Sequence, residues 1–443
     1  MPVTRLLLVA LTTTTLSGAP ASPSAEAAMP LDDLLAAARG TSPLMCALAA
    51  QALTQGSGGL QPPYPTLTLP MAAVRLAVLE ASLESNLPSL LAALDDPDPC
   101  VREIASRLLG RNRGSAVVEG AAARLSAADP ATRAAAAHVL GLTRSAAAVA
   151  ALTDRFGDPE AAVRGNAVWA IGRIGDRGAS PRVWALVRDA AAPVRATAVQ
   201  TLRHLEAQDS VPLIIRVLRT DPDPEVRRVA AWALAELDAG AAAAALAEAL
   251  RSDASAEVRE VAAWALADIE TPEGVAALSE ALRSDDSDAV RATAVWALGT
   301  LEAEAALPLL ERALGDSDAE IRRRAAWAIG TIEPASAPAG LTPALRDDDE
   351  QVRLGAAWAI GQIRDAEALP ALGDALERET SDDVREAVLR ALLRMGERDE
   401  AALTRLIESG SPEIRSQAVA ALAGRSLRPW PWPWPWPQPR PFP

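Results

Sequence analysis

Residues that commonly carry catalysis are scarce in this chain of 443 residues. Its two histidines, His138 and His204, are followed by Val and Leu rather than by acid, base or metal-binding partners. The sequence contains no His-Glu-x-x-His, no Gly-x-Ser-x-Gly, no phosphate-binding glycine loop and no paired cysteine motif. We therefore expect no catalytic residue, no metal ligand and no cofactor, and predict that the protein is not an enzyme.

The two cysteines, Cys46 and Cys100, form a candidate disulfide. In an oxidising compartment such a pair can form one bridge, which would tie the N-terminal segment to the helices that follow. The alternative is two buried small apolar side chains. Both interpretations stay open, because sequence does not give the separation of the two residues.

Tryptophan recurs at a spacing that favours a binding surface. Six tryptophans each follow an arginine by five residues, and they are Trp169, Trp232, Trp264, Trp296, Trp327 and Trp358. Tryptophan is strongly enriched at binding hot spots. A row of indoles on a surface otherwise rich in Ala and Arg would suit an extended, proline-containing or aromatic protein ligand.

The C-terminus is a second candidate binding element. Residues 429–437 alternate Pro and Trp, which removes amide donors and favours an extended polyproline II rod. We interpret residues 426–443 as a docking tail; insertion into a membrane interface and a tail without a role are the alternatives. At about 3.1 Å per residue the tail would span roughly 55 Å, enough to dock on its own chain. Its indoles are Trp430, Trp432, Trp434 and Trp436.

The elements that hold these residues are helical repeats. An acidic turn, a Val-Arg pair or a close variant, and an Ala-rich run recur about every 31 residues, and Val74-Arg75 begins an irregular first repeat. We predict an all-α solenoid superhelix of about twelve helical hairpins. The repeated arginines are Arg102, Arg133, Arg164, Arg195, Arg227, Arg259, Arg291, Arg322, Arg353, Arg385 and Arg415.

Within one period, the turn at residues 221–224 precedes an apolar-periodic helix from Glu225 to Leu237, and residues 238–240 separate it from a second helix that ends near Leu250. Asp and Pro before a helix are the expected N-cap and first-turn residues, and Gly near its end is expected to stop it. A hairpin of this size cannot bury its apolar face alone, so neighbouring hairpins must stack.

A helical wheel places the tryptophans away from the hairpin core. With Val163 at zero, Ala167 and Ile171 fall on the buried side, whereas Trp169 lies at about 240°. The helix with the tryptophans is expected to line the concave side. The alternative is that each indole lies against the neighbouring second helix and fills a gap between alanines. Repeats without Trp carry Arg107, His138, Gln200, Arg390 and Ala420 at this position.

The repeated arginines have a structural interpretation. An Asp lies five residues before the Val in several repeats, so Arg and Asp of adjacent turns are expected to form a ladder of ion pairs and caps. An anion-binding site is the less favoured interpretation. The aspartates are Asp158, Asp221, Asp253, Asp285, Asp316 and Asp347.

Stretches such as 226–234 (Val-Arg-Arg-Val-Ala-Ala-Trp-Ala-Leu) and 321–330 (Ile-Arg-Arg-Arg-Ala-Ala-Trp-Ala-Ile-Gly) resemble the short HEAT-like repeats of the phycobilisome-lyase type. The resemblance covers roughly residues 71–423 and implies the solenoid fold. Its family includes bilin lyases, deoxyhypusine hydroxylases and bacterial scaffolds. The hydroxylases bind iron through His-Glu pairs, which this chain lacks. Alternatives to a scaffold are a lyase-like or hydroxylase-like enzyme and the detached sensor arm of a membrane signalling system.

The N-terminus indicates export. Arg5, an apolar run over residues 6–16 and small residues near 19–27 fit a bacterial secretory signal, although an uncleaved anchor is the alternative. We expect a periplasmic or secreted protein with a signal peptide at 1–28, a helical cap and Gly/Pro-rich link at 29–70, the solenoid at 71–425 and the tail at 426–443. The net charge of -15 argues against nucleic acid as a partner.

These observations predict an exported adaptor, with no enzymatic activity, that binds protein or peptide partners through the concave face and the tail. Docking of the tail on its own chain is a further expectation. Membrane association is the less favoured alternative.

Overall fold

The computed structural model describes residues 31–41, 46, 86–237 and 240–395, together with residues 412, 415, 416 and 419. The signal peptide expected at 1–28, Val74-Arg75 and the tail at 426–443 lie outside the described residues. The chain divides into two compact units, a first unit up to Ser210 and a second unit from Val211.

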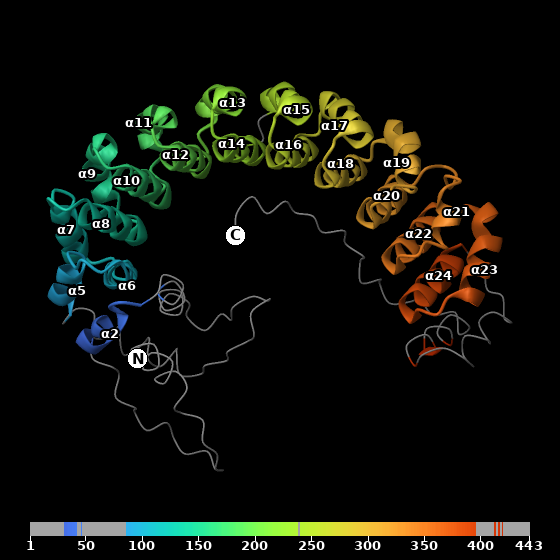
Figure 1. Cartoon of the computed structure of the whole chain (residues 1–443), viewed down its shortest axis with the longest axis horizontal. Coiled ribbons are helices and arrows are strands. Elements are labelled where there is room, and N and C mark those ends of the chain that lie inside the picture. The colour runs from blue at the N-terminus through green and yellow to red at the C-terminus, as the bar shows by residue number, and fades with distance from the viewer. Residues whose placement is uncertain are drawn as a thin grey trace, which may run out of the picture. The chain divides into compact units, whose positions relative to one another are not determined.

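The first unit is built from helices and short 3-10 turns, and its described residues contain no strand (Figure 1). Its helices are α2 (Leu31–Ala38), α5 (Leu87–Ala93), α6 (Pro99–Leu109), α7 (Ser115–Arg124), α8 (Pro130–Thr143), α9 (Val149–Thr153), α10 (Ala161–Ile174), α11 (Ser180–Val183) and α12 (Ala192–His204). The 3-10 turns are η1 (Ala146–Ala148), η2 (Asp154–Gly157), η3 (Arg177–Ala179), η4 (Trp184–Arg188) and η5 (Gln208–Ser210).

The second unit repeats the same pattern of hairpins. Its helices are α13 (Val211–Thr220), α14 (Pro224–Glu236), α15 (Ala243–Ser252), α16 (Ala256–Ile269), α17 (Pro272–Ser284), α18 (Asp288–Thr300), α19 (Leu307–Ala313), α20 (Ala319–Ile332), α21 (Leu341–Ala344), α22 (Glu350–Ile363), α23 (Leu369–Arg378) and α24 (Asp382–Arg394). The 3-10 turns are η6 (Gly240–Ala242), η7 (Glu304–Ala306) and η8 (Ala366–Ala368).

Each unit has two layers of helices. From α5 onward, the odd-numbered helices of each unit form an outer layer. The even-numbered helices form an inner layer, on the inside of that unit's curve (Figure 1). Consecutive inner helices touch within a unit, as α8 touches α10 and α20 touches α22. The helix that carries the repeated Arg and Trp is the inner one, so the predicted stacking of hairpins and the all-α solenoid are confirmed.

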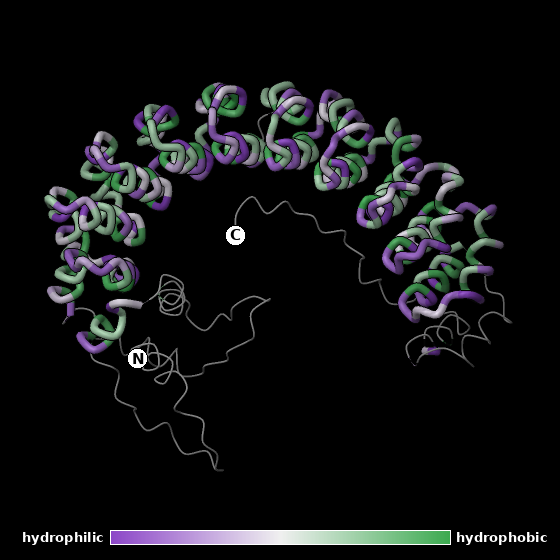
Figure 2. The backbone as a smooth tube through the Cα atoms, in the orientation of Figure 1, coloured by the Kyte–Doolittle hydropathy of each residue, from purple (hydrophilic) through white to green (hydrophobic). Residues whose placement is uncertain are grey.

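The core lies between the two layers. Most of the described helices carry both hydrophobic and hydrophilic residues, as expected of helices with one buried face (Figure 2). Val163 and Ile171 of α10 and Leu152 of α9 are all 0% exposed. Small alanines allow close approach of the helices, and each larger aliphatic side chain that is fully buried contributes about 1.5–3 kcal/mol.

The inner helices begin as the sequence predicts. Asp98, Asp129 and Asp223 are N-caps whose carboxylates accept backbone N–H hydrogen bonds, for example from Glu225 at 2.9 Å. Each is followed by a proline at the first helical position. These caps satisfy amides that the first turn of a helix leaves without a partner.

The helix ends differ in part from the prediction. Among the glycines near the ends of the inner helices, Gly175 is a left-handed C-cap, with φ at 80°. Other stops are charged residues with positive φ, such as Arg144 at 52° and Glu333 at 48°. Gly110, which follows Leu109, is likewise the C-cap of α6. Other glycines of the Leu-Gly and Ile-Gly pairs, such as Gly330, lie inside the helices. The prediction that these glycines end the helices is therefore confirmed at Gly110 and Gly175 and wrong at the positions inside the helices.

The N-terminal cap attaches to the first inner helix. The Arg39 guanidinium donates to the Asp96 carboxylate at 2.8 Å, and the Gly40 N–H donates to Asp98 at 2.8 Å. The structure joins Cys46 and Cys100 in a disulfide, with their Cα atoms 5.6 Å apart. Asp96 lies five residues before Val101, which is the position of the ladder carboxylate in the later repeats. Arg39 of the cap therefore binds the carboxylate that an arginine of a preceding repeat would otherwise bind.

Reduction of the disulfide is expected to release the cap. The cap's remaining charged contact is exposed, since the Arg39 side chain is 60% accessible, and such a pair contributes about 1 kcal/mol or less. Hydrogen exchange should show faster exchange of α2 amides after reduction and unchanged exchange in α10, which serves as the internal control. Equal protection of α2 with and without reductant would contradict this prediction.

Candidate partner-binding face

The repeated arginines connect successive repeats, as the ladder interpretation predicts. The Arg259 guanidinium donates to both carboxylate oxygens of Asp285, at 2.8 and 2.9 Å, and to the backbone carbonyl of Asp253 at 3.0 Å. The same bidentate hydrogen bonding joins Arg133 to Asp158, Arg164 to Asp189, Arg227 to Asp253, Arg322 to Asp347 and Arg353 to Glu379.

The ladder is electrostatically strong because it is largely buried. The side chains of Arg259 and Asp285 are 11% and 7% exposed. Burial alone would raise the pKa of Asp285, but hydrogen bonds from Arg259 and from the Ser287 N–H hold that pKa below its usual range. The pKa of Arg259 is raised, first by its hydrogen bonds to Asp285. These guanidinium groups are engaged within the fold, so the anion-site interpretation is not supported.

The tryptophan row lies on the inner layer, but its indoles are less exposed than the helical wheel predicts. Trp327 and Trp358 are buried, at 8% and 6% exposed. The other four members are half-buried, and they are Trp169, Trp232, Trp264 and Trp296. The wheel describes a single hairpin and omits the neighbouring repeat, which covers part of each ring.

Glycines of the preceding repeat receive some of these rings. A Cβ atom at Gly299 would lie 2.7 Å from Trp327 Cζ3, and one at Gly330 would overlap Trp358. Gly141 stands in the same relation to Trp169, at 2.6 Å. The alternative that each indole packs against the neighbouring inner helix is therefore confirmed at these three positions. For Trp327 and Trp358 it replaces the expectation of an exposed binding ring.

The first unit places an aromatic pair on its inner layer. The His138 ring stacks on the Trp169 ring, with centroids 4.6 Å apart and planes 9° from parallel. The Arg173 guanidinium lies over the same indole at 5.9 Å. Burial lowers the pKa of His138, and the charges of Arg107 and Arg173 lower it further, against the opposing effects of Glu103 and Asn166. The imidazole is therefore neutral near pH 7.

Sequence reasoning missed one aromatic side chain. Trp184 in η4 is 37% exposed, more than any tryptophan of the row within the described residues. It belongs to the outer layer and has no counterpart in the tryptophan row. A search restricted to the spacing after the repeated arginine could not find it. The tail tryptophans of residues 430–436 lie outside the described residues.

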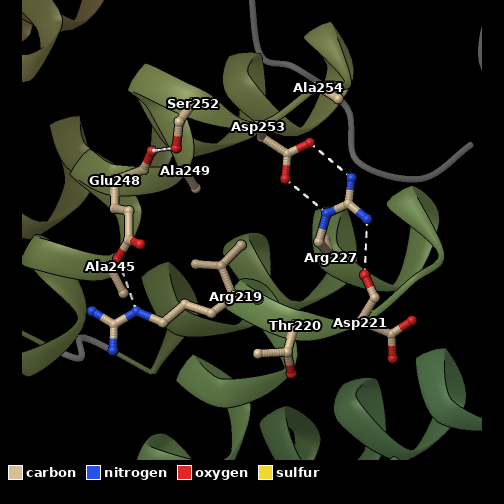
Figure 3. Close-up of a pocket in the computed structure, with 11 residues that line it drawn as sticks. Arg219, Thr220, Asp221, Arg227, Ala245, Glu248, Ala249, Ser252, Asp253 and Ala254 are labelled. Carbon is tan, nitrogen blue, oxygen red and sulfur yellow. Dashed lines mark hydrogen bonds and ion pairs between the residues drawn. The ribbon is translucent and has the colours of Figure 1, made fainter.

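A polar pocket of about 250 Å³ opens between α13 and α15 of the second unit (Figure 3). Arg227 reaches Asp253 across it, and Arg219 pairs with Glu248 at 2.9 Å. Because both guanidinium groups already have carboxylate partners, the pocket is a gap in the ladder region rather than a charged ligand site.

Within the described ranges, no group of His, Cys, Asp and Glu side chains is arranged to hold a metal ion. No described helix combines the length and the apolar character that crossing a bilayer requires.

Stacked hairpins with an inner layer of parallel helices define an α-solenoid, a class of protein rather than an active site. The model of HEAT repeats matches this chain in overlapping segments, and the chain belongs to that family. The matched segments are 87–172, 118–203, 179–267, 243–330, 275–348, 307–393 and 338–423. The phycobilisome-lyase-like subtype is not distinguished by this match.

Solved structures with the same fold include importin-type solenoids. Kap95p in complex with RanGDP is 15% identical with a TM-score of 0.59, covering 89% of this chain and 61% of that one. An importin beta structure is 14% identical with a TM-score of 0.59, at 88% and 64% coverage, and yeast importin-beta is 14% identical with a TM-score of 0.53, at 86% and 63% coverage. The chain thus spans less than two thirds of these proteins. No curated protein matches it.

Proposed function

We propose that this protein is an exported adaptor, without enzymatic activity, that binds protein or extended peptide partners through the inner layer of its HEAT solenoid. The Pro-Trp tail acts as a second docking element. The observation that carries the proposal is the series of half-buried indoles at Trp232, Trp264 and Trp296. They lie on successive inner helices of the second unit, and each residue stays partly accessible.

The geometry of the inner layer supports binding of an extended ligand. Parallel helices repeat the same position at the spacing of helix packing, about 8–10 Å, so a ligand that lies across them meets similar contacts in each repeat. Large aromatic surfaces contribute much of the energy at such contacts. Kap95p, which shares only the fold, is described in complexes with RanGDP and with Nup1.

Export is the second part of the proposal. Its supports are the apolar N-terminal run with small residues behind it and the disulfide between Cys46 and Cys100. A disulfide persists in the periplasm or outside the cell, whereas cytosolic thiols are kept reduced.

The test compares proteins captured from envelope extract by the full chain, by a chain that ends at Leu427, and by a chain with Ser at Trp430, Trp432, Trp434 and Trp436. Loss of the same partners in both variants, with unchanged acrylamide quenching of the repeat tryptophans, identifies the tail as an outward docking element. Identical partners, with repeat tryptophans newly accessible, mean that the tail covers the inner layer. Capture of no specific partner by any of the three chains would refute the adaptor function.

A further inference from the structure

The C-terminal ends of the inner helices in the first unit are rich in arginine. The ninth and eleventh residues after each repeated arginine lie at the C-terminal ends of the inner helices. In the first unit these positions include Arg111, Arg144, Arg173 and His204, with Glu206 as the acidic exception. In the second unit they hold Glu236, Glu270, Glu302 and Glu333, followed by the basic pair Arg364 and Arg394.

Two of these arginines have no carboxylate partner within the described ranges. Arg144 is the exposed left-handed C-cap of α8, and Arg173 is an exposed residue in the last turn of α10. Arg173 lies over Trp169. Its pKa is lowered, first by burial and then by the positive charge of Arg144. Because α8 and α10 pack against each other, Arg144 and Arg173 lie on neighbouring helix ends, and the two cations repel each other.

The local fold does not require these charges. A cation at a helix C-terminus gains about 0.3–1 kcal/mol from the helix dipole. However, Glu270 and Glu333 occupy the same C-cap position as Arg144 in other repeats, where the dipole disfavours them. Arg364, with Arg394 beside it, repeats the arginine pair in the second unit, so the position accepts either charge. Arg144 and Arg173 differ from that pair because the Trp169 indole lies under Arg173, whereas Arg390 takes the place of the indole in α24.

We propose that Arg144, Arg173 and Trp169 form a docking site for an acidic protein segment. A carboxylate of the segment lies between the two guanidinium groups, and an adjacent apolar side chain packs against the accessible part of the indole. The proposal rests on the function above, because it names the partner chemistry of that face. Arginine forks match carboxylates in geometry, and binding would relieve the repulsion between the two cations.

A protein segment fits this edge better than nucleic acid. Binding of a polynucleotide gains most of its strength from neutralising many phosphates along a track. Here the basic stretch is short, because the next repeat carries an acidic residue, Glu206, at the position of Arg144. Glu206 forms an ion pair with Arg177. The chain's net charge of -15 also repels a long polyanion.

The test uses the full chain and a fluorescein-labelled peptide of glutamates with one central phenylalanine, followed by fluorescence anisotropy. The variant is Arg144→Ser with Arg173→Ser. The matched control is Arg364→Ser with Arg394→Ser, which changes the same two positions in two successive repeats of the second unit, where Arg390 stands in place of the indole. We expect the first pair to weaken binding about tenfold or more, from the loss of two charged hydrogen bonds, and the control pair to leave it within about twofold.

Several outcomes would overturn the proposal. One is equal weakening by both pairs, and another is binding that neither pair changes; either would move the acidic ligand elsewhere while leaving the adaptor function intact. Absence of peptide binding up to about 1 mM would also overturn it, and partner capture from extract would then decide the adaptor function separately. Preferential binding of a thymidine oligonucleotide that the first pair abolishes would assign the edge to nucleic acid. Should the double variant melt early, Arg144→Ser alone, at an exposed residue, supplies the comparison.

Discussion

Replacing Arg259 with Ala is expected to lower the free energy of unfolding of the second unit by about 3 kcal/mol, because the change leaves Asp285 buried without its main partner. The matched control is Arg251→Ala. Arg251 also pairs with the next repeat, through Glu280 at 2.9 Å, but both side chains are about half exposed, at 42% and 54%. Exposed pairs contribute about 1 kcal/mol or less. Urea unfolding followed by circular dichroism measures both changes.

The same ladder sets the response to acid. The pKa values of Asp158, Asp253, Asp285 and Asp347 are held below the usual carboxyl value in the folded state. Their contribution to stability is therefore complete above the unfolded-state pKa near 3.8 and is lost as pH falls through the lower folded-state values. The wild type should lose stability more steeply than Arg259→Ala below about pH 4. Parallel acid titrations of the two proteins, or equal costs for Arg259→Ala and Arg251→Ala, would refute the assigned role.

Replacing Gly330 with Ala is expected to destabilise the second unit by about 2 kcal/mol, although alanine is the better helix former. The added methyl group would overlap Trp358 and lie 2.8 Å from the Ala359 Cα atom. The ring has little room to turn, because Trp358 is 6% exposed, and the backbone of α22 would have to move away from α20.

The control for this change is Gly373→Ala in α23. Nothing lies within 4 Å of a Cβ atom at Gly373, so the methyl group enters open space and only helix propensity acts. That substitution should raise stability by up to about 1 kcal/mol. Thermal melting of both variants measures the contrast, and a melting temperature for Gly330→Ala at or above that of the wild type would show that α20 and α22 separate easily.

The sequence predicts the helices, their N-caps and the ladder, because each depends on residue types at fixed short spacings. Asp223 and Pro224 start α14 as expected, and Arg227 contacts Asp253 in the next turn. The fold is thus encoded largely within one period and its neighbour.

Exposure of the tryptophans could not be predicted in the same way. Whether an indole is covered depends on the residue that faces it in the preceding repeat, which a helical wheel of one hairpin omits. Trp327 meets Gly299 and is buried. In the repeat before Trp264, the corresponding position holds Ala235 instead of glycine, and Trp264 is half-buried. Trp169 meets Gly141 yet is half-buried, so the facing glycine is not the only determinant.

The sequence predicts the N-terminal cap but not its ion pair with the first inner helix. The Arg39–Asp96 contact joins residues 57 positions apart, and Arg39 lies in no recognisable repeat. Similarly, the change from Arg144 and Arg173 to Glu236 and Glu270 at the ends of the inner helices emerges only when residues are compared at equal positions in the repeat. Neither the net charge nor any local motif contains that information.

Each contact between repeats uses one residue from each of two neighbours, and this affects how the repeat array can lengthen by duplication. The repeat that contains Arg322 carries a ring, Trp327, for the slot in the repeat before it and a slot, Gly330, for the ring of the repeat after it. The same repeat carries the Asp316 carboxylate, which pairs with Arg291 of the repeat before it. Its Arg322 guanidinium pairs with Asp347 of the repeat after it. A tandem duplication of such a unit therefore yields two copies that already complement each other. The array can lengthen by one period without any compensating substitution.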